Sequence, residues 1–151
     1  MKIKVIEKIL GSGFYTGYIP FAPGTFGSLA AIIIYLIPGF EKPEIIIPLT
    51  IIFFVLGIKI GDKFEEVYGK DPSQCTIDEI VGTWISLFLI PKTAVYIIIT
   101  FVIWRIFDII KPYPANKLEK LKGGLGIMMD DVVSGVYAAL FVHLFIFLFS
   151  I

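Results

Sequence analysis

The charged residues of this chain are crowded into short segments, and the long stretches between them carry none. Five such stretches contain no Asp, Glu, Lys or Arg: residues 9–40, 45–58, 80–91, 93–104 and 132–151. The last one reaches the length of about 20 residues that an α-helix needs to cross the hydrocarbon core of a bilayer. Soluble domains carry more charge than this, so the pattern favours a protein built from membrane helices.

We therefore predict an all-α fold, a polytopic membrane helical bundle of about four to five apolar helices, with residues 1–151 as a single domain. The predicted helices lie at residues 24–40, 43–60, 77–90, 93–110 and 132–151. The segment 77–90 is the shortest, and its length as a helix is only about 21 Å, against a hydrocarbon core of about 30 Å. It is expected to form a short helix inside the bundle, or a re-entrant one.

The overall composition agrees with a membrane protein and excludes several other classes. Hydrophobic residues make up 57% and charged residues 17%, and the 13 basic and 13 acidic residues give a formal net charge of zero. High hydrophobicity without net charge excludes intrinsic disorder, and the absence of a basic excess argues against nucleic-acid binding. Cys75 is the single cysteine, which excludes an intramolecular disulfide and a Cys-rich metal site.

The basic residues are distributed unevenly among the predicted loops. Ten lysines fall in the N-terminal segment and in the loops after the second and fourth helices, whereas only Lys42 and Lys92 lie in the other connections. By the positive-inside rule, the N-terminus and the lysine-rich loops are expected in the cytoplasm. The acidic residues between 62 and 71 lie among these lysines and are expected on a solvated surface.

Three further acidic clusters have apolar sequence on both sides. They occur in CTIDEIVGTW, WRIFDIIKP and GIMMDDVVSG, and they consist of Asp78, Glu79, Asp108, Asp130 and Asp131. A carboxylate at the border of a membrane segment is costly to bury, so it usually has a partner or a function. Helix capping is the alternative, with Asp130 and Asp131 at the start of the last helix. If the clusters converge on the cytoplasmic side, their oxygens suit a hard cation such as Mg²⁺.

Two Gly-rich stretches are compatible with phosphate binding. PFAPGTFGSLAA covers residues 20–31, and KGGLGIMMDD precedes the last apolar segment. Thr25 or Ser28 is expected as the N-cap of a helix, where free backbone N–H groups near Gly24 would accept a phosphate. Ordinary turns, or glycines that let helices pack closely, are the alternative.

Two cations accompany the central acidic cluster. Arg105 and Asp108 are three residues apart and share a helix face, either as an intramembrane ion pair or with the arginine on a phosphate. Lys111 precedes a proline and is expected at the helix end. His143 is the only histidine, there is no Asp-x-Asp motif, and no arginine follows Cys75 six residues on. The common histidine, aspartyl and cysteine phosphatase sites are therefore excluded, which leaves carboxylates, a metal and phosphate.

Four blocks of sequence together resemble the phosphatidylglycerophosphatase A family. They are GSGFYTGYIPFAPGTFGSLAA, TIDEIVGTWISL, RIFDIIKPYP and GGLGIMMDDVVSGVYAA, in order from residue 11 to about residue 140. The resemblance implies a Mg²⁺-dependent phosphatase that converts phosphatidylglycerophosphate to phosphatidylglycerol. Together with the distribution of the lysines, it implies a multi-pass protein of the bacterial inner (cytoplasmic) membrane with its active site facing the cytoplasm. It also implies that the five acidic residues named above are the active-site positions.

The mechanism expected from these residues is metal-assisted hydrolysis of a phosphomonoester. The expected Mg²⁺ ligands are Asp78, Asp108, Asp130 and Asp131. Glu79 is expected to orient the attacking water or to act as general base. The residues expected to hold the phosphate are Gly24, Thr25, Ser28, Arg105 and Lys111. An aspartate nucleophile that forms an aspartyl-phosphate is the alternative.

Three other functions remain as alternatives: a small cation transporter, a non-catalytic membrane subunit, and a phosphatase for another lipid phosphate. A transporter predicts carboxylates at mid-membrane depth and matching acids on the far side, where only Glu41 and Glu44 are available. The expected partners are a phospholipid substrate and the bilayer, and no nucleic acid. The sequence carries no signal for an oligomeric state.

Overall fold

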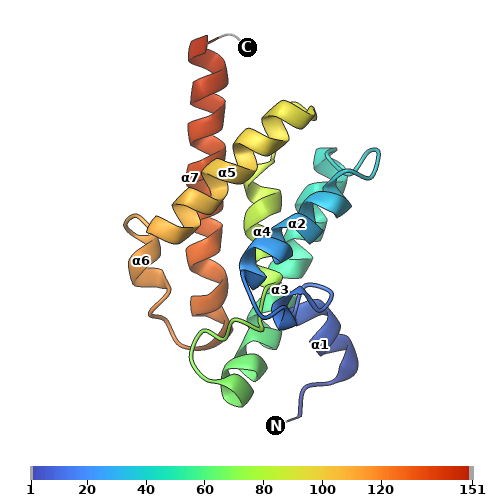
Figure 1. The fold of residues 1–151 in the computed structure, drawn as a ribbon, viewed down its shortest axis with the longest axis vertical. Helices are drawn as coiled ribbons and strands as arrows, with labels where there is room; N and C mark the ends of the chain where they lie inside the picture. The colour runs from blue at the N-terminus through green and yellow to red at the C-terminus, as the bar shows by residue number, and fades with distance from the viewer. Residues whose placement is uncertain (1, 150–151) are drawn as a thin grey trace.

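The computed structural model describes residues 2–149, and this part of the chain is helical without any strand (Figure 1). The elements are α1 (Val5–Gly11), the 3-10 helix η1 (Thr16–Tyr18), α2 (Pro23–Tyr35), α3 (Pro43–Tyr68), α4 (Ile77–Ser86), α5 (Ala94–Ile110), α6 (Ala115–Leu118) and α7 (Gly123–Phe149). The predicted all-α class is therefore confirmed. Two helices are longer than predicted, because α3 continues beyond its apolar part and α7 begins before residue 132.

Two of the described helices, α3 and α7, are long and apolar enough to cross a membrane. They have 26 and 27 residues, with mean hydropathies of 2.1 and 2.3 in their apolar windows. At a rise of 1.5 Å per residue, each is about 40 Å long. The helices α2 and α5 have only 13 and 17 residues, so four to five spans remain a prediction. Exposed aliphatic and aromatic side chains line α3, α5 and α7, a surface that lipid tails would suit.

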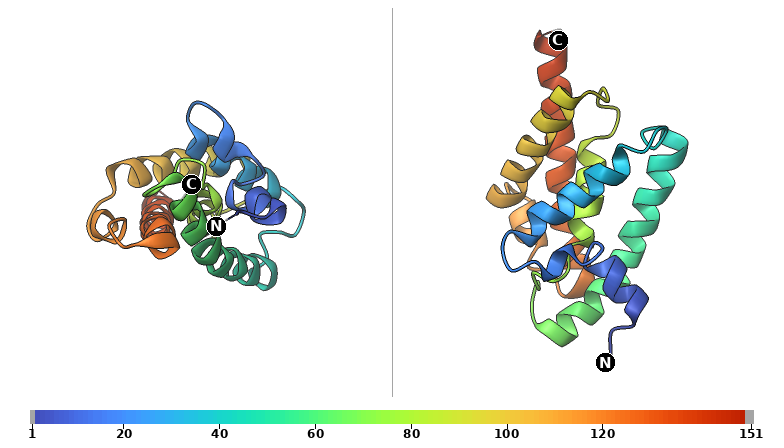
Figure 2. Two further views of the ribbon diagram at one scale, coloured as in Figure 1. Left: turned by 90° about the horizontal axis from the view of Figure 1, so that it is seen from below. Right: turned by 45° about the vertical axis from the view of Figure 1, so that its right-hand side comes forward.

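The short helix α4 lies at the centre of the bundle, between α3 and α7, and also contacts α2 and α5 (Figure 2). Of its ten residues, all except Ile85 are buried. Trp84 packs against Phe40 and Phe53 with ring centroids 5.0 Å apart in both pairs, and its Nε1 donates to the carbonyl oxygen of Ala31 at 3.0 Å. The structure thus agrees with a short internal helix in this segment.

Glycines allow α7 to approach its neighbours closely. A Cβ atom on Gly135 of α7 would lie 2.7 Å from the carbonyl oxygen of Gly82 on α4. A Cβ atom on Gly61 of α3 would lie 2.7 Å from Cα of Gly124 on α7. Larger side chains at these positions would push the helices apart. The contact between Gly82 and Gly135 therefore sets how closely α4, with its acidic residues, approaches α7.

The start of α2 differs from the prediction. The N-cap is Ala22, at φ 45°, and Pro23 is the first helical residue. Proline is favoured there because its fixed φ suits the first turn and its missing N–H needs no partner. Thr25 and Ser28 consequently lie inside the helix, and the prediction that one of them is the N-cap is wrong.

The start of α7 also differs, because the helix begins about two turns before the Asp130-Asp131 pair. The capping alternative for this pair is therefore wrong. Two carboxylates of α3 satisfy the first N–H groups instead: Gly124 donates to Oδ1 of Asp62 at 2.8 Å, and Gly123 donates to Oε1 of Glu65 at 3.1 Å. Asp62 is exposed and Glu65 half-buried, which agrees with the expected solvated surface, and both residues also tie α3 to the start of α7.

Candidate active site

The three acidic clusters converge on one pocket of about 410 Å³. The pocket lies where the starts of α2 and α4, the end of α5 and the first third of α7 meet, with the loop before α4 as a further wall. Its lining residues are Ala22, Pro23, Gly24, Asp71, Pro72, Ser73, Cys75, Thr76, Asp78, Glu79, Arg105, Asp108, Ile109, Lys111, Asp130 and Asp131. The five acidic residues singled out in the sequence therefore share one site.

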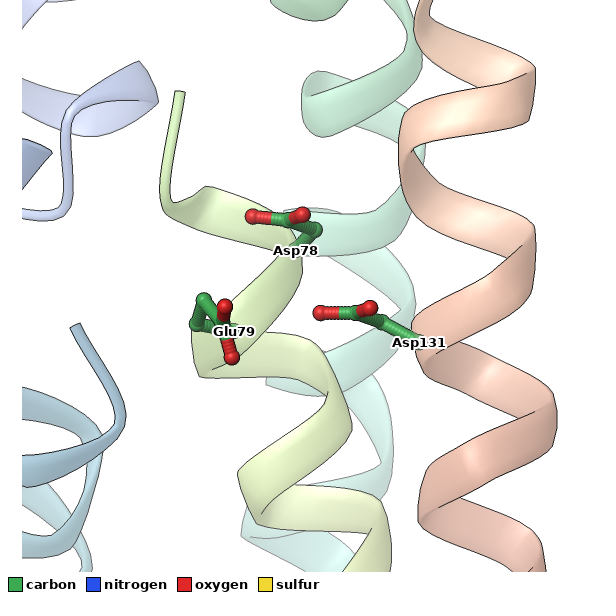
Figure 3. A group of neighbouring side chains, drawn as sticks. All are labelled: Asp78, Glu79 and Asp131. Atoms are coloured by element: carbon green, nitrogen blue, oxygen red, sulfur yellow. The ribbon is translucent and has the colours of Figure 1, made fainter. Parts of the chain in front are cut away.

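Three of the carboxylates form a compact group. Asp78 and Glu79 lie in the first turn of α4, and Asp131 reaches toward them from α7 (Figure 3). One oxygen from each residue lies within 4.8 Å of the others. Oδ1 of Asp78 and Oδ2 of Asp131 are buried and have no hydrogen-bond partner among the described residues. Buried carboxylate oxygens without partners are costly, and a bound cation would remove that cost.

Arg105 links the group to α5. Its Nη1 donates to Oε2 of Glu79 at 2.6 Å and to Oδ2 of Asp108 at 2.7 Å. The second contact confirms that Arg105 and Asp108 share a helix face as an ion pair. The guanidinium group thus holds carboxylates of two helices in a fixed relation.

Lys111 has the corresponding role at the end of α5, where it is the C-cap residue, as predicted. Its Nζ lies 2.6 Å from Oδ2 of Asp130, 3.3 Å from Oδ1 of Asp108 and 3.9 Å from Oδ1 of Asp131. Asp108 and Asp130 are ion-paired and lie outside the compact group of three, although Oδ1 of Asp130 is also buried without a hydrogen-bond partner among the described residues. Glu79, which was expected to orient the attacking water or to act as general base, belongs to that group.

The pocket has a large excess of negative charge. Six acidic residues line it against two basic ones, Arg105 and Lys111, which gives a formal excess of four negative charges. Like charges at such short distances repel one another strongly in a desolvated site. The arrangement is therefore suited to bind cations, with the two basic side chains available to an anionic group at the same time.

Asp71 is the sixth acidic residue, and the structure places it in the pocket lining although it was expected on a solvated surface. It lies in the loop before α4, at φ 45°. Its side chain is accessible at the pocket, but the surrounding protein desolvates the carboxyl group and raises its pKa. The flanking lysine-rich sequence made Asp71 indistinguishable from an ordinary surface residue.

Only some of the residues predicted to hold phosphate lie at the pocket. Gly24, Arg105 and Lys111 line the pocket, whereas Thr25 and Ser28 do not. A Cβ atom on Gly24 would lie 2.3 Å from Oε1 of Glu79, so only glycine leaves that oxygen room. Ser28 is fully buried behind Glu79 and donates to its Oε2 at 3.3 Å.

Comparisons with known proteins place the chain in one family. The family profile for phosphatidylglycerophosphatase A matches residues 9–146. A protein of Bacteroides thetaiotaomicron, provisionally named phosphatidylinositol-3-phosphatase, is 43% identical over 138 residues, which cover 86% of this chain and 87% of that protein. No solved structure shows significant similarity to the chain.

Two relatives carry the family's own name. Phosphatidylglycerophosphatase A of Haemophilus influenzae is 37% identical over 147 residues, covering 93% of this chain and 90% of that protein. The Escherichia coli protein of the same name is 34% identical over 134 residues, covering 87% of this chain and 78% of that protein. A profile match over nearly the whole chain, with relatives of this identity and coverage, shows that the chain belongs to the phosphatidylglycerophosphatase A family and is a phosphoric monoester hydrolase.

Proposed function

We propose that the protein hydrolyses the terminal phosphomonoester of phosphatidylglycerophosphate, giving phosphatidylglycerol and inorganic phosphate, with Mg²⁺ as cofactor. The observation that carries the proposal is the pair of buried, unpartnered carboxylate oxygens on Asp78 and Asp131, beside Glu79 in a strongly acidic pocket. Family membership supplies the substrate class.

The residues of the compact group fit Mg²⁺. The ion prefers oxygen ligands, and it is usually bound by a few carboxylates together with waters and substrate phosphate. Asp78, Glu79 and Asp131 would hold it, since each has a carboxylate oxygen near those of the other two. When bound, Mg²⁺ would neutralise charge on the phosphate and activate the attacking water.

The two basic side chains of the pocket have a separate task in this proposal. Arg105 and Lys111 offer further N–H groups to the phosphate oxygens, on which negative charge spreads during phosphoryl transfer. Asp108 and Asp130 hold these cations in place through the ion pairs already described. Because both cations are fixed before substrate binds, less side-chain entropy is lost when the phosphate arrives.

Phosphate release from a defined lipid tests the proposal directly. Purified protein in detergent should release inorganic phosphate from phosphatidylglycerophosphate when Mg²⁺ is present. A chelator should stop this release, and excess Mg²⁺ should restore it. Glycerol 3-phosphate should be a poor substrate, because it lacks the binding energy of the acyl chains. Folded protein that releases no phosphate from the lipid would contradict the proposal and favour a cation transporter or a non-catalytic subunit.

Phosphatidylinositol 3-phosphate should be tested as a second substrate, because the Bacteroides thetaiotaomicron relative is provisionally named as a phosphatase for it. Its rate of hydrolysis should be measured beside that of phosphatidylglycerophosphate, in the same detergent and at the same surface concentration. We expect phosphatidylglycerophosphate to have the higher kcat/KM. The opposite order would assign the phosphatase activity to the inositol lipid.

We also propose that the protein lies in the bacterial inner membrane with the pocket facing the cytoplasm. The bacterial relatives, the two long apolar helices and the ten lysines at one side support this orientation. Cys75 is buried and cannot report topology, so Cys75→Ser is the background for new cysteines. An impermeant maleimide added to spheroplasts should label Lys42→Cys, in the connection between α2 and α3, and spare Asn116→Cys on α6. The reverse pattern would contradict the orientation.

A further inference from the structure

Behind Glu79, two buried side chains that do not line the pocket form a chain of hydrogen bonds. Ser28 of α2 and Trp104 of α5 are both fully buried. Nε1 of Trp104 lies 3.2 Å from Oγ of Ser28, which lies 3.3 Å from Oε2 of Glu79. Three helices thus meet through one serine hydroxyl.

The direction of this chain follows from the chemistry of its members. An indole N–H can only donate a hydrogen bond, so Oγ of Ser28 must accept from Trp104. The hydroxyl then has its single proton left to give, and an ionised carboxylate can only accept it. Ser28 therefore donates to Glu79, and the indole dipole strengthens that donation.

The other oxygen of Glu79 points the other way. Oε2 already accepts from both Ser28 and Arg105. Oε1 lies beside Gly24 on the pocket wall, and no described residue donates a hydrogen bond to it. Two donors therefore anchor one oxygen of the carboxylate, while the second remains available to the contents of the pocket.

The close packing of Trp104 against α4 requires a glycine at position 82. A Cβ atom on Gly82 of α4 would lie 2.2 Å from the ring of Trp104. The indole therefore occupies the space beside α4 that an alanine would need. The position of the ring, and with it the position of the indole N–H, is determined by packing and not by the hydrogen bond alone.

We propose that Ser28 and Trp104 are positioning residues that orient the Glu79 carboxylate for phosphate-monoester hydrolysis. The inference rests on the proposed function for the role of Glu79, but the hydrogen-bond chain can be tested without substrate. Ser28 acts on Glu79 directly, and Trp104 acts only through Ser28. Neither side chain touches the substrate in this proposal.

A spectroscopic experiment tests the chain itself. Protein labelled with ¹⁵N-tryptophan in detergent should give two indole N–H signals, because the chain contains two tryptophans. Trp84, which donates to a backbone carbonyl, serves as the internal reference. Ser28→Ala should shift the Trp104 signal and leave the Trp84 signal in place. Glu79→Gln should shift the Trp104 signal as well, because the charge that polarises the serine is lost. If Ser28→Ala leaves the Trp104 signal unshifted, the proposed chain of hydrogen bonds is refuted.

Kinetics on phosphatidylglycerophosphate test the positioning role. Ser28→Ala should lower kcat about tenfold with little change in KM, as expected for the loss of a hydrogen bond to a charged group. Trp104→Phe should lower kcat less, and the double variant should match Ser28→Ala alone. In a Glu79→Gln background, Ser28→Ala should have no further effect, since residues in one network are not additive.

A matched control separates positioning from general packing. Ser86 of α4 is also fully buried, and its Oγ donates to the carbonyl oxygen of Thr83 at 2.7 Å, away from the pocket. Ser86→Ala should lose thermal stability to a similar extent as Ser28→Ala but keep its kcat. If the wild type is active but Ser28→Ala leaves kcat unchanged, the positioning role is refuted and the proposed function stands. The same conclusion follows if the effects on kcat are additive in the double variants. Wild-type protein without phosphatase activity would refute the proposed function instead.

Discussion

Replacement of Lys111 by methionine should destabilise the protein more than loss of an ordinary ion pair. Methionine keeps most of the length of the side chain and removes its charge. The variant leaves Asp108, Asp130 and Asp131 without their shared ammonium group, in a pocket that already has a formal excess of negative charge. Lys92 is the comparison, because its Nζ has a single carboxylate partner, Oε2 of Glu41 at 2.6 Å, besides the carbonyl oxygen of Ile37 at 2.9 Å.

The magnitude follows from the distances. Coulomb energy varies with the inverse of distance, so the three contacts of Lys111 give about 2.5 times the gross attraction of the single contact of Lys92. The two side chains are similarly accessible, at 23% and 20%. Accessible ion pairs contribute at most about 1 kcal/mol. We therefore expect a loss of about 1 kcal/mol for Lys92→Met and about 2–3 kcal/mol for Lys111→Met, applying the same ratio.

Thermal unfolding in detergent, followed by circular dichroism with a chelator present, measures the difference. For a chain of this size, 1 kcal/mol corresponds to about 2–4 °C in Tm. Lys111→Met should therefore lower Tm by about 4–12 °C, against about 2–4 °C for Lys92→Met. Mg²⁺ should reduce the difference in Tm between Lys111→Met and the wild type, because a bound cation relieves the repulsion among the pocket carboxylates. Equal losses in the two variants would refute the reasoning.

Three further predictions concern other parts of the molecule. Asp131→Asn should lower turnover about a hundredfold or more in the phosphate-release assay, whereas Glu66→Gln, on the exposed end of α3, should leave it unchanged. Gly82→Ala should lower stability to heat by about 1–3 kcal/mol, because its Cβ atom would meet the Trp104 ring. Burial raises the pKa of the Cys75 thiol, so maleimide should label it slowly in folded protein at pH 8 and rapidly after denaturation, as mass spectrometry would show.

Apolar stretches predicted where helices occur better than where they end. The run from residue 132 onward identified the apolar part of α7 but not the turns before it, residues 123–131, which contain three glycines and two aspartates. Those turns are helical because Asp62 and Glu65 cap them from α3, a contact between residues about 60 positions apart. Such long-range capping has no local signature in the sequence.

The convergence of the acidic clusters was predictable because a carboxylate in an apolar segment needs a partner. The roles of the individual carboxylates were not. Asp130 and Asp131 are neighbours in sequence, yet Asp130 pairs with Lys111 and Asp131 joins Asp78 and Glu79. Successive residues on an α-helix point about 100° apart, so their partners depend on how α7 is rotated against α4 and α5. That rotation is set by tertiary packing.

The short, buried helix α4 has a consequence for how the protein is made. A segment of ten residues is too short to be inserted into a bilayer as an independent span, and its acidic first turn makes insertion costlier still. The helix with which α4 makes its most extensive contacts, α7, follows it in the chain and is synthesised after it. The site therefore cannot be complete before α7 has been synthesised, because Asp130 and Asp131 lie on that helix.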